Sequence, residues 1–248
     1  MSYRLGVDVG GTFTDLLLIN EITGETHTAK VPSTPEDSSV GVLNGIARIC
    51  QESGVDVSKI GRVMHGTTVA TNAVLTGKGA KVGLVTTKGY KQVLQVARSF
   101  CPGGLGGWVS FVKKPLLAPL ELTIEADERM SAKGQTVTEL DEVALREQLL
   151  KLKNTGQVEA LTICFINSYL NGAHEQQAKN IASEFFTDVP ISISSDVVPE
   201  MQEYERTETT VVNSYVRPEV ARYVDNLSQS LMGKMGNDLH LSILRSDG

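Results

Sequence analysis

The sequence predicts an α/β protein that contains a mixed β-sheet, and two patterns support this prediction. Short apolar segments typical of strands alternate with segments that carry apolar residues at helical spacing, which favours helices layered against a sheet. Residues 4–31 break this alternation, because they show strands joined directly by turns. Strands joined by tight turns pair antiparallel and strands joined through helices pair parallel, so we expect both kinds of pairing.

The opening segment predicts three short strands and then a helix. Apolar residues alternate with small or polar ones from Leu5 to Val9, a second strand ends at Ile19, and a third strand covers residues 25–31. The helix is predicted from Thr34, as the N-cap, to about Ser53. Pro35 suits its first position, acidic residues follow, and a glycine ends it.

The rest of the chain continues the alternation. Further strands are expected at residues 60–64, 81–86, 122–126, 159–166, 191–195 and 239–243, and helices at residues 67–75, 90–97, 141–153, 172–186 and after Pro199. Pro218 lies inside the last helical stretch and predicts a kink or a break there. Residues 99–119 are rich in Gly and Pro and predict a loop, either a lid over a site or a surface excursion.

Composition excludes several classes of partner. The formal net charge of -6 disfavours nucleic acid and anionic membrane surfaces as partners. The apolar runs are too short to cross a bilayer, and no signal-peptide pattern opens the chain, so we expect a cytoplasmic protein. Cys50 and Cys164 are expected in the core and Cys101 in a loop. His27, His174 and His240 show no acidic or cysteine partner in the pattern, so no metal site is predicted around them.

The strongest candidate for a functional site is the turn between the first two strands, which reads DVGGTFTD over residues 8–15. Nucleotide phosphates need clustered backbone amides, close approach without a Cβ in the way, and a metal ion that offsets their charge. Gly10 and Gly11 permit such a turn, and Thr12 and Thr14 add hydroxyl groups. We therefore predict that these four residues bind nucleotide phosphates.

Two carboxylates flank this turn. Asp8 ends the first strand on the face opposite Leu5 and Val7, and Asp15 lies on the returning strand. A hard Mg²⁺ ion that keeps several waters suits Asp8, with Asp15 the weaker candidate. Both are predicted as catalytic residues and Asp8 as the metal ligand. The alternative is an ordinary hairpin turn with two solvated acids, but the length of the string favours the phosphate site; no P-loop or dinucleotide fingerprint occurs.

A second candidate lies at the strand-to-helix junction of residues 65–68. Free amides, the helix dipole and the hydroxyl groups of Thr67 and Thr68 favour an anion or a polar substrate group there. His65 is a candidate proton carrier near neutral pH. The alternative is that one threonine caps the helix and that His65 satisfies a buried carbonyl.

The motifs resemble known proteins at two levels. The opening hairpin resembles the first phosphate-binding hairpin of the actin, sugar-kinase and heat-shock-chaperone superfamily. Two longer strings, HGTTVATNAVL at residues 65–75 and EYERTETTVVNSYVRP at residues 203–218, resemble the hydantoinase/oxoprolinase family specifically. The resemblance implies the N-terminal part of an actin-like ATPase, which has a ribonuclease H-like fold with a mixed sheet.

The second string also has a plainer explanation. Its glutamates flank Arg206 at helical spacing, so a solvated ion-pair network accounts for them. That account leaves Tyr204, Asn213 and Arg217 unexplained, and our hypothesis is that they shape the cleft or a partner interface.

The resemblance further implies a function. Family members are ATP- and Mg²⁺-dependent enzyme subunits that act on cyclic amides such as hydantoin, N-methylhydantoin or 5-oxoproline, and related members are subunits of acetone- or acetophenone-type carboxylases. ATP phosphorylates the oxygen of the cyclic amide or ketone substrate, and a partner completes the reaction. That partner is a hydantoinase B-type subunit or a fused C-terminal half.

The resemblance also divides the chain. Residues 1–198 correspond to the N-terminal domain with the phosphate hairpin, and residues 199–248 to the start of a second, hydantoinase A core region. No second hairpin string occurs, and the sequence ends directly after a strand. We therefore expect a piece of a longer protein that alone binds ATP weakly and is inactive.

Two rival functions share the hairpin. One is a small-molecule kinase of the sugar or acyl type, and the other is a non-catalytic actin-like module that binds nucleotide. Both leave the two family-like strings unexplained.

Overall fold

The protein is described by a computed structural model that covers residues 2–34, 37–99, 103–104, 106–107, 113–235 and 239–244. The chain divides into two compact units. Unit 1 comprises Met1–Gly77 and Glu219–Gly248, and unit 2 comprises Lys78–Pro218. The predictions for Pro35 and Cys101, and nine of the 21 residues of the predicted loop at residues 99–119, lie outside the described residues.

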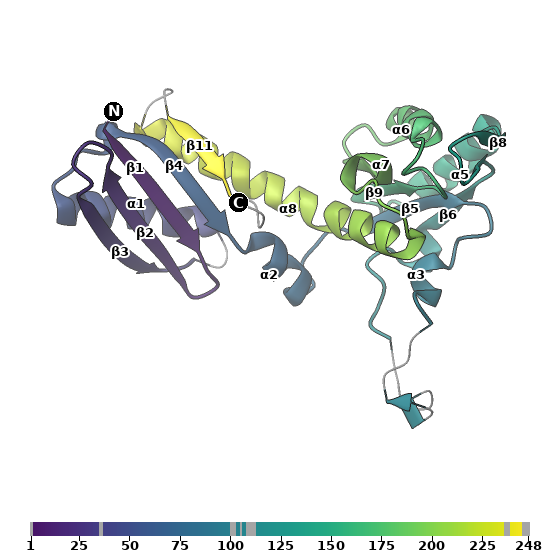
Figure 1. Cartoon of the computed structure of the whole chain (residues 1–248), viewed down its shortest axis with the longest axis horizontal. Helices are drawn as coiled ribbons and strands as arrows, with labels where there is room; N and C mark the ends of the chain where they lie inside the picture. The colour runs from purple at the N-terminus through teal and green to yellow at the C-terminus, as the bar shows by residue number, and fades with distance from the viewer. Residues whose placement is uncertain are drawn as a thin grey trace. The chain divides into compact units, whose positions relative to one another are not determined.

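Unit 1 is built on a five-stranded mixed sheet (Figure 1). Its strands are β1 Tyr3–Val9, β2 Phe13–Asn20, β3 Thr26–Pro32, β4 Ile60–Thr67 and β11 His240–Ile243. Across the sheet they follow the order β3, β2, β1, β4, β11. The three opening strands pair antiparallel, whereas β4 pairs parallel with both β1 and β11. The predicted mixed sheet is therefore confirmed.

Helix α1 Ser38–Ser53 and the second half of α8 Glu203–Met235 pack against one face of this sheet. The short 3-10 helix η1 Val57–Lys59 precedes β4, and α2 Val69–Thr76 follows it. Leu5, Leu18, Ile46 and Leu227 are among the fully or almost fully buried residues of the core between α1, α8 and the sheet. Alternation along β1 and β2 sends Asp8 and Asp15 to the opposite, exposed face, as the sequence predicted for Asp8.

The first helix begins later than the sequence predicted. Asp37, and not Thr34, is its N-cap, and the Asp37 carboxylate accepts a hydrogen bond from the Ser39 amide at 2.9 Å. The Thr34 hydroxyl accepts from the Gly41 amide at 2.9 Å from outside the helix. A carboxylate caps better than a threonine hydroxyl and also interacts favourably with the helix dipole. Gly54 ends the helix in the left-handed region at φ 69°, as predicted.

Unit 2 is built on a four-stranded parallel sheet. Its strands are β5 Val82–Thr87, β6 Thr123–Ala126, β9 Ala160–Cys164 and β10 Ile191–Ile193, in the order β10, β9, β5, β6. The remaining elements of this unit are α3 Val93–Val96, η2 Leu120–Leu122, β7 Arg129–Met130, β8 Thr136–Thr138, α5 Glu142–Asn154, α6 Ala173–Phe185, α7 Ser194–Val197 and the first half of α8. The strands are buried on both faces, which is typical of parallel sheets.

Two features of unit 2 and α8 differ from the sequence predictions. The small hairpin of β7 and β8 was not predicted, because two- and three-residue strands leave no alternation to read. The long helix continues past Pro218, so the predicted break does not occur, although a proline inside a helix removes a hydrogen bond; the alternative of a kink stays a prediction. Buried residues on both sides of the proline, Tyr215 and Tyr223 among them, stabilise the continuous helix by packing.

The cysteines follow the predictions where they are described. Cys164 is buried in unit 2, and its burial raises the pKa of the thiol. Cys50 packs partly against the core of unit 1. Across the ranges that the structure describes, no helix combines the length and the apolar character needed to cross a membrane.

Candidate phosphate-binding site

The turn between β1 and β2 is closed by a hydrogen bond from the Gly10 amide to the Phe13 carbonyl at 3.0 Å. Neither Gly10 nor Gly11 adopts a positive φ. A Cβ on Gly10 would lie 3.1 Å from the Phe13 carbonyl oxygen, so crowding favours glycine there. A Cβ on Gly11 would meet nothing within 4 Å, so the missing side chain at Gly11 leaves space beside the turn that a ligand can use.

The tip of this turn keeps its backbone donors free. Among the residues that the structure describes, the amides of Gly11 and Thr12 donate no hydrogen bond to another group of the chain. Both residues are exposed. Exposed backbone amides grouped at a turn form a concavity that suits an anion.

A residue that the sequence analysis did not single out holds the turn from the end of β3. The Ser33 hydroxyl donates to the Gly10 carbonyl at 2.8 Å, and the Ser33 amide donates to the Thr12 carbonyl at 2.9 Å. The hydroxyl groups of Ser33 and Thr14 lie 3.0 Å apart. A serine directly after a strand carries no signal by itself, so only the three-dimensional structure reveals this contact.

Two carboxylates lie side by side on the exposed sheet face next to the turn. Asp8 pairs with Asp15 across β1 and β2, where like charges repel each other. Lys30 on β3 offsets part of this charge, because its ammonium lies 3.0 Å from Asp15. On the other side of Asp8 stands Gly66 of β4, which has no side chain to fill the space beside the carboxylate. Asp8 therefore remains available to a cation.

The same exposed face contains an open depression of about 800 Å³. Asp8 and Asp15 belong to its lining, together with apolar side chains of the sheet such as Leu17 and Met64. The depression can accommodate a ligand group beside the paired carboxylates.

The start of α2 adjoins the turn. Thr67 pairs with Val9 in the sheet, and both the amide and the hydroxyl of Thr68 donate to the Val9 carbonyl, at 3.4 and 3.2 Å. The Thr67 hydroxyl accepts from the Val69 amide at 3.2 Å, which is the structural role that the sequence left open for one threonine. Thr68 is the N-cap, but its side chain accepts no backbone amide of the helix; its hydroxyl accepts from the side-chain amide of Asn72 at 3.3 Å.

Two of the predicted site residues are buried instead of exposed. The side chain of Thr14 faces the core and contacts Ser33. His65 is also fully buried, and the Tyr223 hydroxyl lies 2.6 Å from its Nε2 atom. Burial lowers the pKa of His65 to about 4, against smaller opposite effects of Val7 and Asp8. A neutral, enclosed imidazole favours the structural alternative for His65 over a proton carrier at neutral pH.

The structure thus brings most of the predicted residues to one end of the unit 1 sheet. Asp8 and Asp15 stand on its exposed face, the tip of the turn follows directly, and the threonines of residues 67–68 adjoin the end of β1. Thr14 and His65 lie behind this surface, within the core.

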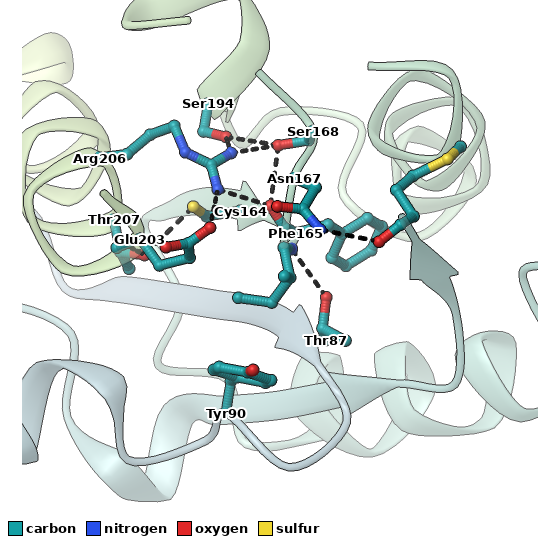
Figure 2. Close-up of polar contacts among 12 residues, drawn as sticks. Thr87, Tyr90, Cys164, Phe165, Asn167, Ser168, Ser194, Glu203, Arg206 and Thr207 are labelled. Atoms are coloured by element: carbon teal, nitrogen blue, oxygen red, sulfur yellow. Dashed lines mark hydrogen bonds and ion pairs between the residues drawn. The ribbon is translucent and has the colours of Figure 1, made fainter. Parts of the chain in front are cut away.

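Unit 2 contains a separate polar cluster around Arg206, which Figure 2 shows. The guanidinium reaches from α8 to the hydroxyl groups of Ser168 and Ser194 and to the Phe165 carbonyl, the last at 2.8 Å. Glu203 lies 3.8 Å away. Because Arg206 is only 1% exposed, the alternative of a solvated ion-pair network does not hold for it, although its i,i+3 pair with Glu203 is present. The arginine instead holds α8 against the ends of β9 and β10.

A buried carboxylate completes this cluster. Glu175 of α6 accepts hydrogen bonds from the hydroxyl groups of Ser168 and Ser194 at 2.8 and 2.6 Å, and from the Phe165 amide at 2.8 Å. The two serines therefore bridge a buried carboxylate and a buried guanidinium, and the charges compensate each other within the core.

Other polar residues of unit 2 also have structural partners. The sequence predicted no acidic partner for His174, and this prediction is wrong. The Nδ1 atom of His174 lies 2.8 Å from buried Glu128, and its Nε2 atom lies 3.7 Å from Glu139. Asn213 donates to the Ser192 hydroxyl at 3.1 Å, and Arg217 to the Ile191 carbonyl at 3.2 Å, so both fasten α8 to β10. Across the described ranges, no three His, Cys, Asp or Glu residues gather in a way that could hold a metal ion.

Comparison with known proteins identifies relatives along the whole chain. The hydantoinase/oxoprolinase N-terminal region matches residues 4–186. The chain is 33% identical to caprolactamase subunit alpha of Pseudomonas jessenii over 99% of this chain and 36% of the relative. It is 31% identical to the acetophenone carboxylase gamma subunit of Aromatoleum aromaticum (98% and 35%) and 29% identical to 5-oxoprolinase of Dictyostelium discoideum (100% and 22%).

A solved structure supports the same family for the fold of the chain. The crystal structure of ATP-dependent caprolactamase from Pseudomonas jessenii matches with a TM-score of 0.87 and 32% identity, over 97% of this chain and 35% of that chain. This match confirms the predicted actin-like ATPase fold. The chain spans 36% or less of the length of these relatives.

Proposed function

Because the chain belongs to the hydantoinase/oxoprolinase family, we propose that it is the N-terminal, ATP-binding part of an ATP-dependent cyclic amide hydrolase subunit. The substrates proposed are of the hydantoin, N-methylhydantoin or 5-oxoproline type. ATP phosphorylates the amide oxygen of the substrate, which turns a poor leaving group into phosphate. The caprolactamase of Pseudomonas jessenii is ATP-dependent. Both caprolactamase and 5-oxoprolinase have the names of cyclic amide hydrolases.

The free amides at the tip of the β1–β2 turn are the observation that carries this proposal. Gly11 and Thr12 present donors that no other group of the described chain uses, and Gly11 leaves the adjacent space open. Backbone donors of this kind bind phosphate oxygens without the reorganisation that flexible side chains require. The start of α2, with Thr67 and Thr68, adds the positive end of a helix dipole beside them.

The paired carboxylates fit a magnesium ion. Asp8 and Asp15 supply the oxygen ligands that Mg²⁺ prefers, and their mutual repulsion favours a cation between them. Bound there, Mg²⁺ would offset the charge of the phosphates. Two carboxylates suit an ion that keeps several of its waters.

A partner is part of the same proposal. Two of the relatives are named as subunits, and the chain covers only about a third of their length. We therefore assign the second half of the nucleotide cleft to a further part of the protein. Hydrolysis of the activated substrate is assigned to a hydantoinase B-type subunit or a fused C-terminal half.

Replacement of Asp8 in the longer protein, assayed with its partner, tests this function. Asp8→Asn keeps the shape of the side chain but removes the charge, and we expect phosphate release coupled to ring opening to fall by about 100-fold. Asp56→Asn is the matched control, because Asp56 is an exposed acid of unit 1 that caps η1. Equal activities of the two variants would contradict the proposal.

Product analysis separates the kinase rival, which would leave a phosphorylated substrate as its stable product.

The non-catalytic rival makes a different prediction in the same assay. A module that only binds nucleotide would show no ATP hydrolysis stimulated by a cyclic amide, even in the longer protein with its partner.

A second candidate function is that of a carboxylase subunit. The 31% identity to the acetophenone carboxylase gamma subunit favours it. A carboxylase would require bicarbonate and a ketone for ATP hydrolysis, whereas the favoured hydrolase would require only the cyclic amide. Comparison of ATP turnover with these two substrate sets distinguishes them.

A further inference from the structure

We propose that Ser33 is a positioning residue that orients the Gly11 amide of the β1–β2 turn toward the phosphates of ATP. This inference rests on the function proposed above and adds a residue that neither the motif nor its spacing includes. Ser33 lies just after β3, 18 or more residues further along the chain than the turn that it holds.

Ser33 binds two carbonyls of the turn. Its hydroxyl donates to the Gly10 carbonyl and its amide donates to the Thr12 carbonyl, at 2.8 and 2.9 Å. Two peptide groups of the turn are therefore fixed by one residue.

The geometry of the peptide bond links these carbonyls to the amides that follow them. In a planar trans peptide the carbonyl and the following amide point in opposite directions. Because the Gly10 carbonyl points toward Ser33, the Gly11 amide points away from Ser33. In the same way, the Thr12 carbonyl points toward Ser33 and the Phe13 amide points away from it. The Gly11 amide then points outward, where it has no partner among the described residues.

Ser33 is itself supported from behind. Thr14 is 0% exposed and its hydroxyl lies 3.0 Å from that of Ser33. Helix α1 closes the other side, since a Cβ on Gly41 would lie 3.4 Å from the Thr14 hydroxyl. Thr14 therefore acts behind the turn, where it holds the Ser33 hydroxyl in place.

The experiment measures binding of MgATP and of adenosine by titration calorimetry in the longer protein with its partner. Adenosine lacks phosphates, so its affinity reports the nucleoside pocket and the integrity of the fold. We expect Ser33→Ala to weaken MgATP by about tenfold, because a Gly11 amide that is no longer held outward loses its hydrogen bond to a charged phosphate oxygen, and such bonds are the strong ones. Adenosine should bind as before, and Ser33→Thr, which keeps the hydroxyl, should retain the MgATP affinity.

Ser53→Ala is the matched control. It removes another half-buried serine hydroxyl of unit 1, one that donates to the Ile49 carbonyl at 2.6 Å at the end of α1. We expect it to change neither affinity. The inference is overturned if Ser33→Ala leaves MgATP binding unchanged, if it weakens both ligands equally, or if Ser33→Thr loses as much affinity as Ser33→Ala.

A variant of the turn itself separates this inference from the proposed function. Gly11→Val fills the space beside the turn and should abolish MgATP binding. If Gly11→Val binds MgATP normally, the proposed function fails. If Gly11→Val loses MgATP while Ser33→Ala keeps it, only the positioning role of Ser33 fails.

Discussion

Single residues at the end of the unit 1 sheet divide into those that face solvent and those that face the core. Asp8 and Gly11 are exposed, whereas Thr14 and His65 are fully buried. Alternation along the strand predicts the face of Asp8 correctly, because neighbouring side chains of a strand point to opposite faces. The same alternation places Thr14 in the core, yet its partner Ser33 belongs to another strand end and no local pattern reveals it.

His65 makes the stability of the protein depend on pH. Its burial holds the pKa at about 4 instead of the ordinary 6.5, so the unfolded chain takes up a proton at a higher pH than the folded one. This contribution to stability is fully present above pH 6.5, falls as the pH drops, and is lost through pH 4. The loss amounts to about 3 kcal/mol.

Urea unfolding at about pH 7 and about pH 4 measures this loss. His65→Gln is the control, because glutamine can bond to Tyr223 but does not titrate. We expect the native protein to lose more free energy of unfolding than the variant between the two pH values. Equal losses would show that His65 takes up its proton as readily in the folded protein as in the unfolded chain.

At the scale of elements, hydrogen-bond caps and buried charge decide where helices begin and what they contact. The segment from Thr34 to Asp37 contains two residues that can cap a helix, and the Asp37 carboxylate is the one that caps α1. The sequence predicted the end of α1 better than its start, since Gly54 is the only residue nearby suited to the left-handed conformation. Buried contacts also explain why α8 continues past Pro218, which propensity alone does not predict.

Arg206 illustrates how far an element depends on one buried charge. Arg206→Met leaves Glu175 and its two serine donors in the core without the compensating cation, so unit 2 should lose about 3 to 5 kcal/mol of stability. Urea unfolding followed by circular dichroism measures the change. Arg146→Met is the control, because Arg146 forms an exposed pair with Glu184 and should matter far less. Equal effects would contradict the buried cluster as a support of α8.

At the scale of the whole molecule, the chain builds unit 1 from two separated segments. β11 pairs with β4 although residues 68–239, 172 in all, lie between them. The sequence predicted both strands and the class of fold, but it did not predict this pairing, because unit 2 intervenes between them. The assignment of residues 1–198 and 199–248 to two family regions is a different kind of division and stays a prediction.

Separation from the rest of the protein should weaken nucleotide binding. The chain presents one phosphate turn and contains no second string of this kind. We expect MgATP to bind the 248-residue chain at least about 100-fold more weakly than the longer protein, because half of the contacts would be missing. Titration calorimetry on both proteins gives the comparison. Equally tight binding to the chain alone would show that the second half is dispensable.

The most direct measurement is a crystal structure of the longer protein with Mg²⁺ and a non-hydrolysable ATP analogue. We expect phosphate oxygens at about 3 Å from the Gly11 amide and the metal ion beside Asp8. Phosphates bound elsewhere, with the turn between β1 and β2 left empty, would contradict the account.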